Sequence, residues 1–132
     1  ESQRIGLVNI PAGFWEQMRN SPVFFLDIPF EERLNHLVEE YGELNKEKMG
    51  GAITRIQKRL GGVETKNALL FLEQNDMKAC FRILLKYYDK YYIKALHNRD
   101  NIETLIQTLP CNSVQPGNVK ILLNQLKIHE NP

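Results

Sequence analysis

The sequence predicts a helix-dominated α/β fold with about two short parallel strands. Two apolar runs, around residues 23–28 and 103–109, have the length and composition of strands, and the first is a continuous apolar run of the kind that parallel sheets bury. The segments between and after them carry apolar residues at helical spacing, enough for five to six helices. Strand, several helices, strand and helix is the element order of a parallel α/β unit.

The N-terminal quarter predicts an extended segment, a short helix and the first strand. Residues 1–11 alternate briefly and end at a proline, which suits an extended or turn conformation. Phe14 and Met18 then follow at helical spacing, so a short helix is expected before the next proline. The run VFFLDIP at residues 23–29 predicts a strand that is buried on both faces.

The middle of the chain predicts several consecutive helices. An apolar stripe begins at Phe30 and predicts an amphipathic helix, which Gly50-Gly51 is expected to interrupt. The next helix is expected to end at Gly61-Gly62, because glycine is favoured just after a helix C-terminus. A further helix is expected over residues 64–73, and Asn75-Asp76 supplies the N-cap chemistry for a long tyrosine-rich helix.

The C-terminal third predicts the second strand and a final helix. Residues 102–109 are short, apolar and rich in β-branched side chains, which is typical of a strand. Pro116 suits the first turn of a helix. The expected apolar stripe of that helix consists of Val119, Leu122, Leu123 and Leu126.

The tyrosine-rich segment LLKYYDKYY, residues 84–92, carries two patterns on one helix. The expected core stripe is Phe81, Leu84, Leu85, Tyr88, Tyr92 and Ala95. On another side, i, i+4 spacing makes a cationic ridge of Arg82, Lys86, Lys90 and Lys94. Tyr87 and Tyr91 fall on the boundary between the two. The ridge suits either a solvated face or an RNA surface, since aromatic and cationic side chains together bind nucleic acid.

Other cations suggest a phosphate site. Arg55, Lys58 and Arg59 are expected on one side of a short helix, where guanidinium groups suit phosphate or diphosphate; a solvated amphipathic helix is the alternative. Arg33 opens the helix just beyond the first strand, and ligands of open α/β sheets bind at the carboxyl ends of strands. Its alternative role is a surface ion pair.

Composition and motifs exclude several classes of function. The 132 residues fit one domain, and 42% apolar and 25% charged residues are ordinary for a soluble protein. Cys80 and Cys111 have no C-x-x-C pairing and no histidines at ligand spacing, so a metal site is not expected. There is no Walker A motif and no apolar stretch near 18 residues. We therefore expect no membrane span and a cytoplasmic protein.

Specific motifs occur in a fixed order along the chain. ES followed by IG and IP occupies residues 1–11, and VFFLDIPFEERLNHLVEEY occupies residues 23–41. IQKRLGG follows at residues 56–62 and LLKYYDKYY at residues 84–92. In this order they resemble the C-terminal part of bacterial tRNA 2-selenouridine synthase, and LLKYYDKYY is the most specific of them.

The resemblance implies a place within a larger enzyme. Members are about three times this length and carry a rhodanese-like domain with a reactive cysteine, followed by a P-loop. Residues 1–132 would then be a single fragment: the C-terminal portion of a P-loop kinase-like domain, beyond the Walker A and Walker B-like strands. Neither Cys80 nor Cys111 lies in a rhodanese-type loop, so no catalytic residue is expected in the fragment.

The resemblance also implies an activity and partners. The family replaces sulfur by selenium at the tRNA wobble uridine through geranylation of 2-thiouridine, with geranyl diphosphate and selenophosphate as substrates. The resemblance implies that Glu1 lies near the edge of a metal or phosphate site. It also implies that Arg33, Arg55 and Arg59 can reach diphosphate. The ridge, with Tyr87 and Tyr91, would contact tRNA around the anticodon.

Three further expectations follow. The 132 residues alone are expected neither to hydrolyse nucleotide nor to transfer selenium, because they contain no phosphate cradle and no reactive thiolate loop. An apolar strand edge without its neighbour is expected to cause self-association. The alternative function is a small helical module, without a nucleic-acid role, whose acidic helix from Glu31 to Glu43 binds a partner protein.

Overall fold

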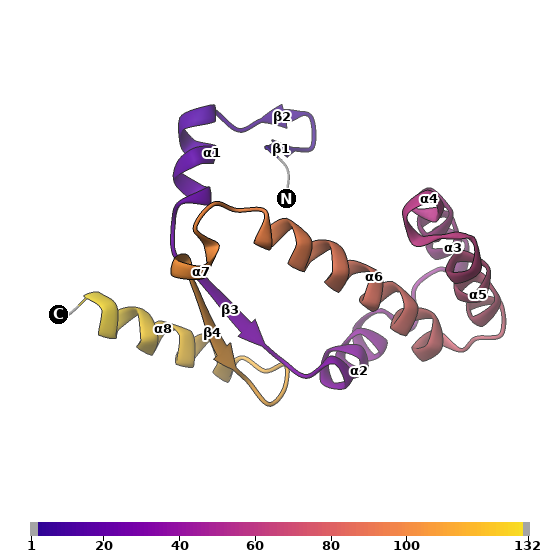
Figure 1. The fold of residues 1–132 in the computed structure, drawn as a ribbon. Helices are drawn as coiled ribbons and strands as arrows, with labels where there is room; N and C mark the ends of the chain where they lie inside the picture. The colour runs from indigo at the N-terminus through magenta and orange to yellow at the C-terminus, as the bar shows by residue number, and fades with distance from the viewer. Residues whose placement is uncertain (1–2, 131–132) are drawn as a thin grey trace. The chain divides into compact units, whose positions relative to one another are not determined.

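The computed structural model describes residues 3–130 of the chain. The chain divides into two units: Glu1–Ile28 with Tyr91–Pro132, here the split unit, and Pro29–Lys90, here the helical unit. The helix α6, Met77–His97, contributes its first part to the helical unit and its last part to the split unit. Figure 1 shows the helices and strands of both units.

The split unit begins with a hairpin and a short helix. β1 (Arg4–Ile5) pairs antiparallel with β2 (Val8–Asn9), and Gly6 between them has a φ of 62°, which glycine adopts without steric cost. Helix α1 (Ala12–Arg19) follows, as the sequence predicts.

A two-stranded parallel sheet forms the centre of the split unit. β3 (Val23–Asp27) pairs in parallel with β4 (Ile106–Pro110), with Val23 opposite Ile106 and Asp27 opposite Pro110. The structure confirms the parallel pairing predicted from the sequence, and Figure 1 shows the two strands side by side. Helix α8 (Gly117–Glu130) follows β4.

The predicted second strand is only partly right. Residues Ile102–Leu105 form the short helix α7 instead of extended chain, and the strand begins at Ile106. Asn101 has a left-handed φ of 58°, and its carbonyl accepts hydrogen bonds from both the N–H and the hydroxyl of Thr104, at 3.0 and 2.8 Å. This local turn overrides the β propensity of the segment.

Burial in the split unit is lower than the sequence predicts. The strand β3 is half-buried over Val23 to Leu26, where burial on both faces was expected. Val119 and Leu123 of α8 are exposed, whereas Leu122 and Leu126 are half-buried, so only part of the predicted stripe of α8 packs. The buried apolar residues of the described part of this unit are Leu96, Ile102, Leu109 and Cys111.

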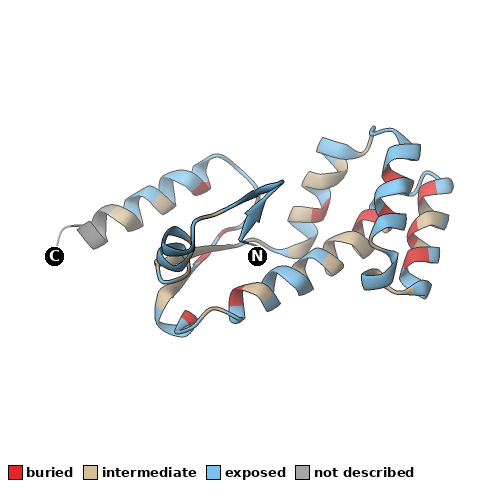
Figure 2. Ribbon diagram, turned by 90° about the horizontal axis from the view of Figure 1, so that it is seen from above, coloured by how far each residue is buried: buried red, intermediate tan, exposed pale blue. Residues whose placement is uncertain are grey.

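The helical unit consists of α2 (Phe30–Tyr41), α3 (Lys46–Arg55), α4 (Gln57–Leu60), α5 (Gly62–Glu73) and the first part of α6. Figure 2 shows its buried positions on these helices. Its core is Leu34, Met49, Ile53, Ala68, Leu72, Cys80 and Phe81. The helix-dominated α/β fold class is thereby confirmed.

The glycine pairs act differently from each other. The prediction that Gly50-Gly51 interrupts a helix is wrong, since both glycines lie inside α3. Packing of Met49 and Ile53 into the core outweighs the low helix propensity of glycine. Gly61, with a φ of 95°, does end α4 as predicted. Asp76 also acts as predicted, since its Oδ1 accepts a hydrogen bond from the N–H of Ala79 at 3.1 Å.

No helix in the described part of the chain combines the length and apolar character that a membrane span requires.

Candidate phosphate and RNA interface

Two ion pairs connect α2 to α6 within the helical unit. The guanidinium of Arg33 donates to both carboxylate oxygens of Asp89, at 2.7 and 2.9 Å, with both side chains about 30% exposed. Arg82 donates in the same two-bond manner to Glu31, with 3.3 Å between its Nη2 and Oε2. Two parallel hydrogen bonds fix the orientation of each guanidinium, which a single contact does not.

The electrostatics follow from these pairs. The hydrogen bonds from Arg82 lower the pKa of Glu31, and the charges of Arg82, Lys78 and Lys86 lower it further. Glu31 in turn raises the pKa of Arg82. Both charges are solvent-exposed, so salt screens this pair. One member of the predicted cationic ridge is therefore already neutralised by a carboxylate.

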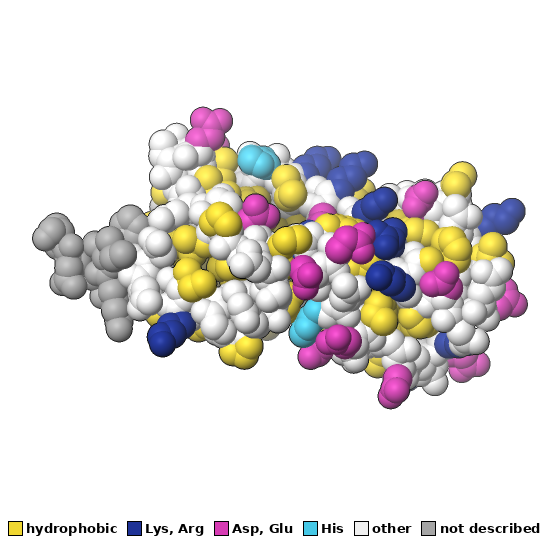
Figure 3. All heavy atoms as spheres, turned by 90° about the horizontal axis from the view of Figure 1, so that it is seen from below, with side chains coloured by type: hydrophobic (Ala, Val, Ile, Leu, Met, Phe, Trp, Pro, Cys, Tyr) yellow, Lys and Arg dark blue, Asp and Glu magenta, His cyan; other side chains and the backbone are white. Residues whose placement is uncertain are grey.

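Two lysines remain as exposed cations of the ridge in the helical unit. Lys86 and Lys90 are exposed, and within the described residues neither forms a salt bridge. Lys94 is also exposed, on the part of α6 that belongs to the split unit. On the face shown in Figure 3, lysine and arginine side chains lie among acidic ones.

The tyrosines are placed differently from the prediction. Tyr88 and Tyr92, expected in the core, are 59% and 72% exposed, because the core contacts of α6 in the helical unit end at Leu85. Tyr87 is half-buried and meets Tyr88 edge to face, with 5.2 Å between the ring centroids. Tyr91 is 38% exposed. The expectation of a tyrosine core stripe is therefore wrong.

The second cationic cluster lies across a helix break. Arg55 ends α3, and Lys58 and Arg59 lie in α4, so Ile56 separates the two helices where one continuous helix was predicted. All three cations are exposed. Arg55 Nε donates to the carbonyl of Gly51 at 3.3 Å, which holds its guanidinium against its own helix.

Three further features of the sequence concern the site: Glu1, the Cys80 thiol and the expectation that no metal is bound. Glu1 lies outside the described residues. Burial, together with the charge of Asp76, raises the pKa of the Cys80 thiol, so this cysteine stays protonated at neutral pH. Among the described residues, no three His, Cys, Asp or Glu side chains come together as a metal site.

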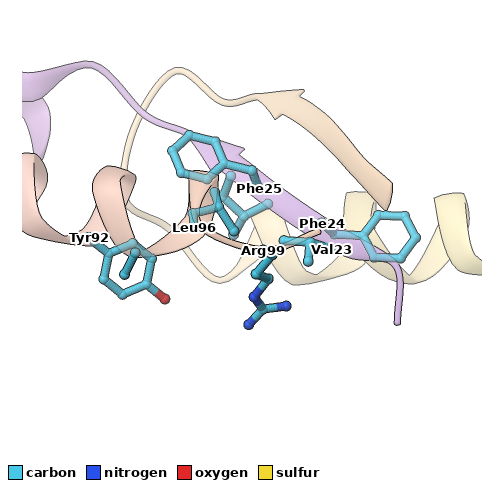
Figure 4. A pocket seen from close by; sticks show the side chains of 8 residues that line it. Val23, Phe24, Phe25, Tyr92, Leu96 and Arg99 are labelled. Atoms are coloured by element: carbon cyan, nitrogen blue, oxygen red, sulfur yellow. The ribbon is translucent and has the colours of Figure 1, made fainter. Parts of the chain in front are cut away.

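The split unit contains a pocket of about 360 Å³ that the sequence did not indicate. Its lining residues are Val23, Phe24, Phe25, Leu26, Tyr92, Ala95, Leu96 and Arg99. Figure 4 shows the phenol of Tyr92 and the guanidinium of Arg99 on the same side of β3. The pocket therefore combines an apolar wall with two polar groups at one side.

Sequence reasoning also missed the two carboxylates of the site. Glu31 and Asp89 lie 51 and 56 residues from their partners Arg82 and Arg33, so no local spacing rule connects them. The ion-pair alternative for Arg33 is the state that the structure shows. Glu31 of the acidic helix is likewise paired, which removes one carboxylate from any acidic partner surface along α2.

A family model and two curated relatives that match this chain carry the same name. The model of a family described as the tRNA 2-selenouridine synthase AAA domain matches residues 1–107. A tRNA 2-selenouridine synthase from Chromohalobacter salexigens is 28% identical over 120 residues, covering 70% of this chain and 33% of the relative. One from Shewanella woodyi is 31% identical over 128 residues, covering 75% of this chain and 35% of the relative.

The chain spans about a third of the length of the curated relatives it matches, as the covered shares of 33% and 35% show. No solved structure matches it. The matched region, residues 1–107, contains both ion pairs, both cationic clusters and the pocket.

Proposed function

Because this chain belongs to the family of the tRNA 2-selenouridine synthase AAA domain, we propose that it contributes tRNA and diphosphate contacts to a tRNA-modifying enzyme. The reaction would be selenation of 2-thiouridine at the tRNA wobble position through geranylation. The family match over residues 1–107 is the observation that carries the proposal. Geranyl diphosphate and selenophosphate would be substrates of the whole enzyme, and no cofactor is proposed for this chain.

The tRNA contact is proposed at the exposed lysines of α6. Lys86 and Lys90 lie one helical turn apart, about 6 Å along the axis, which is close to the spacing of phosphates along one strand of nucleic acid. Neither forms a salt bridge within the described residues, although the charge of Lys86 acts on Glu31, so both ammonium groups are available to phosphate. The anticodon region is the proposed part of the tRNA, because it carries the wobble base.

Diphosphate contacts are proposed at Arg55 and Arg59, with Arg33 as a further cation. Arg55 and Arg59 are exposed at the ends of α3 and α4. Arg33 would have to exchange Asp89 for the ligand, since the structure pairs the two. Arg59→Ala is therefore expected to weaken binding of a diphosphate ligand more than Arg33→Ala does, as measured by calorimetry with geranyl diphosphate.

The tRNA proposal is tested in the full-length natural protein by a double substitution, Lys86→Glu with Lys90→Glu. We expect tRNA affinity to fall by at least tenfold and the slope of affinity against salt to become shallower by one to two phosphate contacts, roughly 1–2 on a log–log plot. Filter binding across several salt concentrations measures both.

A matched control makes the same charge change elsewhere in the helical unit. Lys46→Glu with Lys48→Glu alters two exposed lysines of α3 by the same total charge. An equal loss of affinity in both variants would show a general charge effect and not a contact at α6. Unchanged tRNA affinity in the folded Lys86/Lys90 variant would show that these lysines are only solvated and do not contact tRNA.

A further inference from the structure

Glu31 of α2 is surrounded by three cations of α6, Lys78, Arg82 and Lys86, here the three-cation group. Arg82 donates to both carboxylate oxygens of Glu31, with 3.3 Å between Nη2 and Oε2. Lys78 and Lys86 lie one helical turn before and after Arg82, so all three lie along one side of α6. The hydrogen bonds from Arg82, and further the charges of Lys78 and Lys86, lower the pKa of Glu31. One carboxylate thus faces three positive charges.

The carboxylate of Glu31 makes the contacts that a phosphate group would make. A guanidinium binds carboxylate and phosphate alike through two parallel N–H···O bonds, and Arg82 binds Glu31 in this way. Lysine ammonium groups on either side add positive charge without a fixed direction of approach. The three-cation group therefore has the chemistry of a phosphate site, and a carboxylate of the same chain occupies it.

The two ion pairs between α2 and α6 differ in how easily they exchange. The side chains of Arg82 and Glu31 are 38% and 56% exposed, so water and salt compete for both charges. Arg33 and Asp89 are only about 30% exposed, and the guanidinium of Arg33 also lies over the ring of Phe30. The Arg33–Asp89 pair can thus keep α2 joined to α6 while Glu31 leaves Arg82.

The three-cation group continues the tRNA contact that is proposed at Lys86 and Lys90. Lys86 belongs to both, and Arg82 lies one turn from it, about 6 Å along the helix axis. We propose that the three-cation group is a phosphate site, in which a phosphodiester of the tRNA backbone replaces the carboxylate of Glu31. A polyanion fits better than a small anion, because the cations form a line along α6 and each phosphate contact adds to affinity. This phosphate site depends on the proposed tRNA contact at Lys86 and Lys90.

Glu31→Gln tests the exchange in the full-length natural protein, with tRNA as the ligand. The amide keeps the shape of the side chain and removes its charge, so Arg82 is released to phosphate. We expect tRNA affinity to rise about three- to tenfold and its salt dependence to steepen by roughly 1 on a log–log plot, measured by filter binding. If Glu31 instead positions Arg82 for tRNA, the same variant loses affinity, and that result would overturn the proposal.

Glu32→Gln is the matched control for charge. It removes the same charge from the next residue of α2, whose carboxylate is exposed and forms no salt bridge within the described residues. We expect a clearly smaller gain in tRNA affinity than for Glu31→Gln. Equal gains in the two variants would show a general effect of charge on α2 and would contradict a site at Arg82.

Arg82→Ala in the Glu31→Gln background shows whether Arg82 itself receives the phosphate. We expect this second substitution to remove most of the gain and to reduce the salt dependence by roughly 1. Lys66→Ala in the same background removes an exposed cation of α5 and should leave most of the gain. A gain that survives Arg82→Ala would mean that Arg82 does not contact tRNA, and the site would be wrong.

Two further measurements separate this site from its alternatives. If the Lys86/Lys90 variant loses tRNA affinity while Glu31→Gln and Glu32→Gln behave alike, the tRNA contact at α6 holds and only the exchange at Arg82 is refuted. If none of these variants changes tRNA affinity, both proposals fail. Calorimetry with inorganic diphosphate tests the small-anion alternative: tighter diphosphate binding by Glu31→Gln, with tRNA affinity unchanged, would assign the three-cation group to a small ligand and not to tRNA.

Discussion

Arg33 and Asp89 lie on different helices of the helical unit and form an ion pair with two hydrogen bonds, 2.7 and 2.9 Å long. The guanidinium of Arg33 also lies 5.7 Å from the ring centroid of Phe30, on the same helix. Asp89 lies in the middle of the tyrosine-rich segment, whose function the sequence leaves open. The pair therefore gives this segment a structural role, which is to connect α6 to the first turns of α2.

The Arg33–Asp89 pair is expected to stabilise the helical unit modestly. A double-mutant cycle with Arg33→Ala and Asp89→Ala should give a coupling free energy of about 1 kcal/mol, since both side chains are partly solvated. Arg33→Lys should lose most of that coupling, because an ammonium cannot make the same two parallel hydrogen bonds. Urea unfolding measures each variant. A coupling free energy near zero would mean that solvent competes fully for the pair.

The Glu31–Arg82 pair predicts a pH dependence of stability. Arg82 lowers the pKa of Glu31 below its ordinary value of 4.5, so the carboxylate is favoured in the folded state. A lowered folded pKa contributes stability that is present above pH 4.5 and is lost as the pH falls through the folded pKa. Glu31→Gln should therefore lower the urea midpoint at pH 7, and the difference should vanish once the pH lies below the folded pKa of Glu31.

Salt offers an independent check of this pair. Because the side chains of Glu31 and Arg82 are 56% and 38% exposed, 1 M NaCl should reduce the difference between the native chain and Glu31→Gln at pH 7. A difference that persists in high salt would indicate that Glu31 acts through packing and not through charge.

Tyr88 is expected to be unimportant for stability. Its side chain is 59% exposed, so Tyr88→Ala should lower the free energy of unfolding by less than about 1 kcal/mol, apart from the loss of its contact with Tyr87. Phe81→Ala, on the buried side of the same helix, should cost about 3–5 kcal/mol. Urea unfolding of the two variants gives the comparison. Equal losses would place Tyr88 in the core after all.

Cys80 is expected to report on unfolding. It is fully buried, and its pKa is raised by burial and by Asp76, so iodoacetamide should not react with it in the native protein at pH 8. Labelling should follow the unfolded fraction when urea is added, as mass spectrometry of the peptide that contains Cys80 can show. Rapid native-state labelling of Cys80 would reveal local opening of the helical unit.

Most of the elements could be predicted because their determinants are local. The caps at Gly61 and Asp76, the stripe from Phe30 and the strand at VFFLD depend on neighbouring residues along the chain. The same local reasoning failed at Gly50-Gly51 and at Ile102–Leu105, where core packing in one case and a side-chain turn in the other overrides propensity.

The candidate site was only half predictable for a related reason. Periodicity places Lys86 and Lys90 on one side of α6 correctly, because helix geometry alone decides it. Periodicity also predicts a core position for Tyr88 and Tyr92, but both are exposed. Whether an apolar stripe is buried depends on how far the neighbouring helices extend along α6, and their core contacts end at Leu85.

By itself, the sequence determined the helix-dominated α/β class, the parallel pairing of two strands and the family, because periodicity and motif order are properties of the chain. Only the tertiary structure decided that Arg33 pairs with Asp89, that Glu31 neutralises Arg82 and that β3 borders a pocket with an apolar wall. These features join residues that are more than 50 positions apart, or follow from which surfaces remain uncovered after packing. Burial and long-range charge pairing are set by the arrangement of elements in space, which no local pattern specifies.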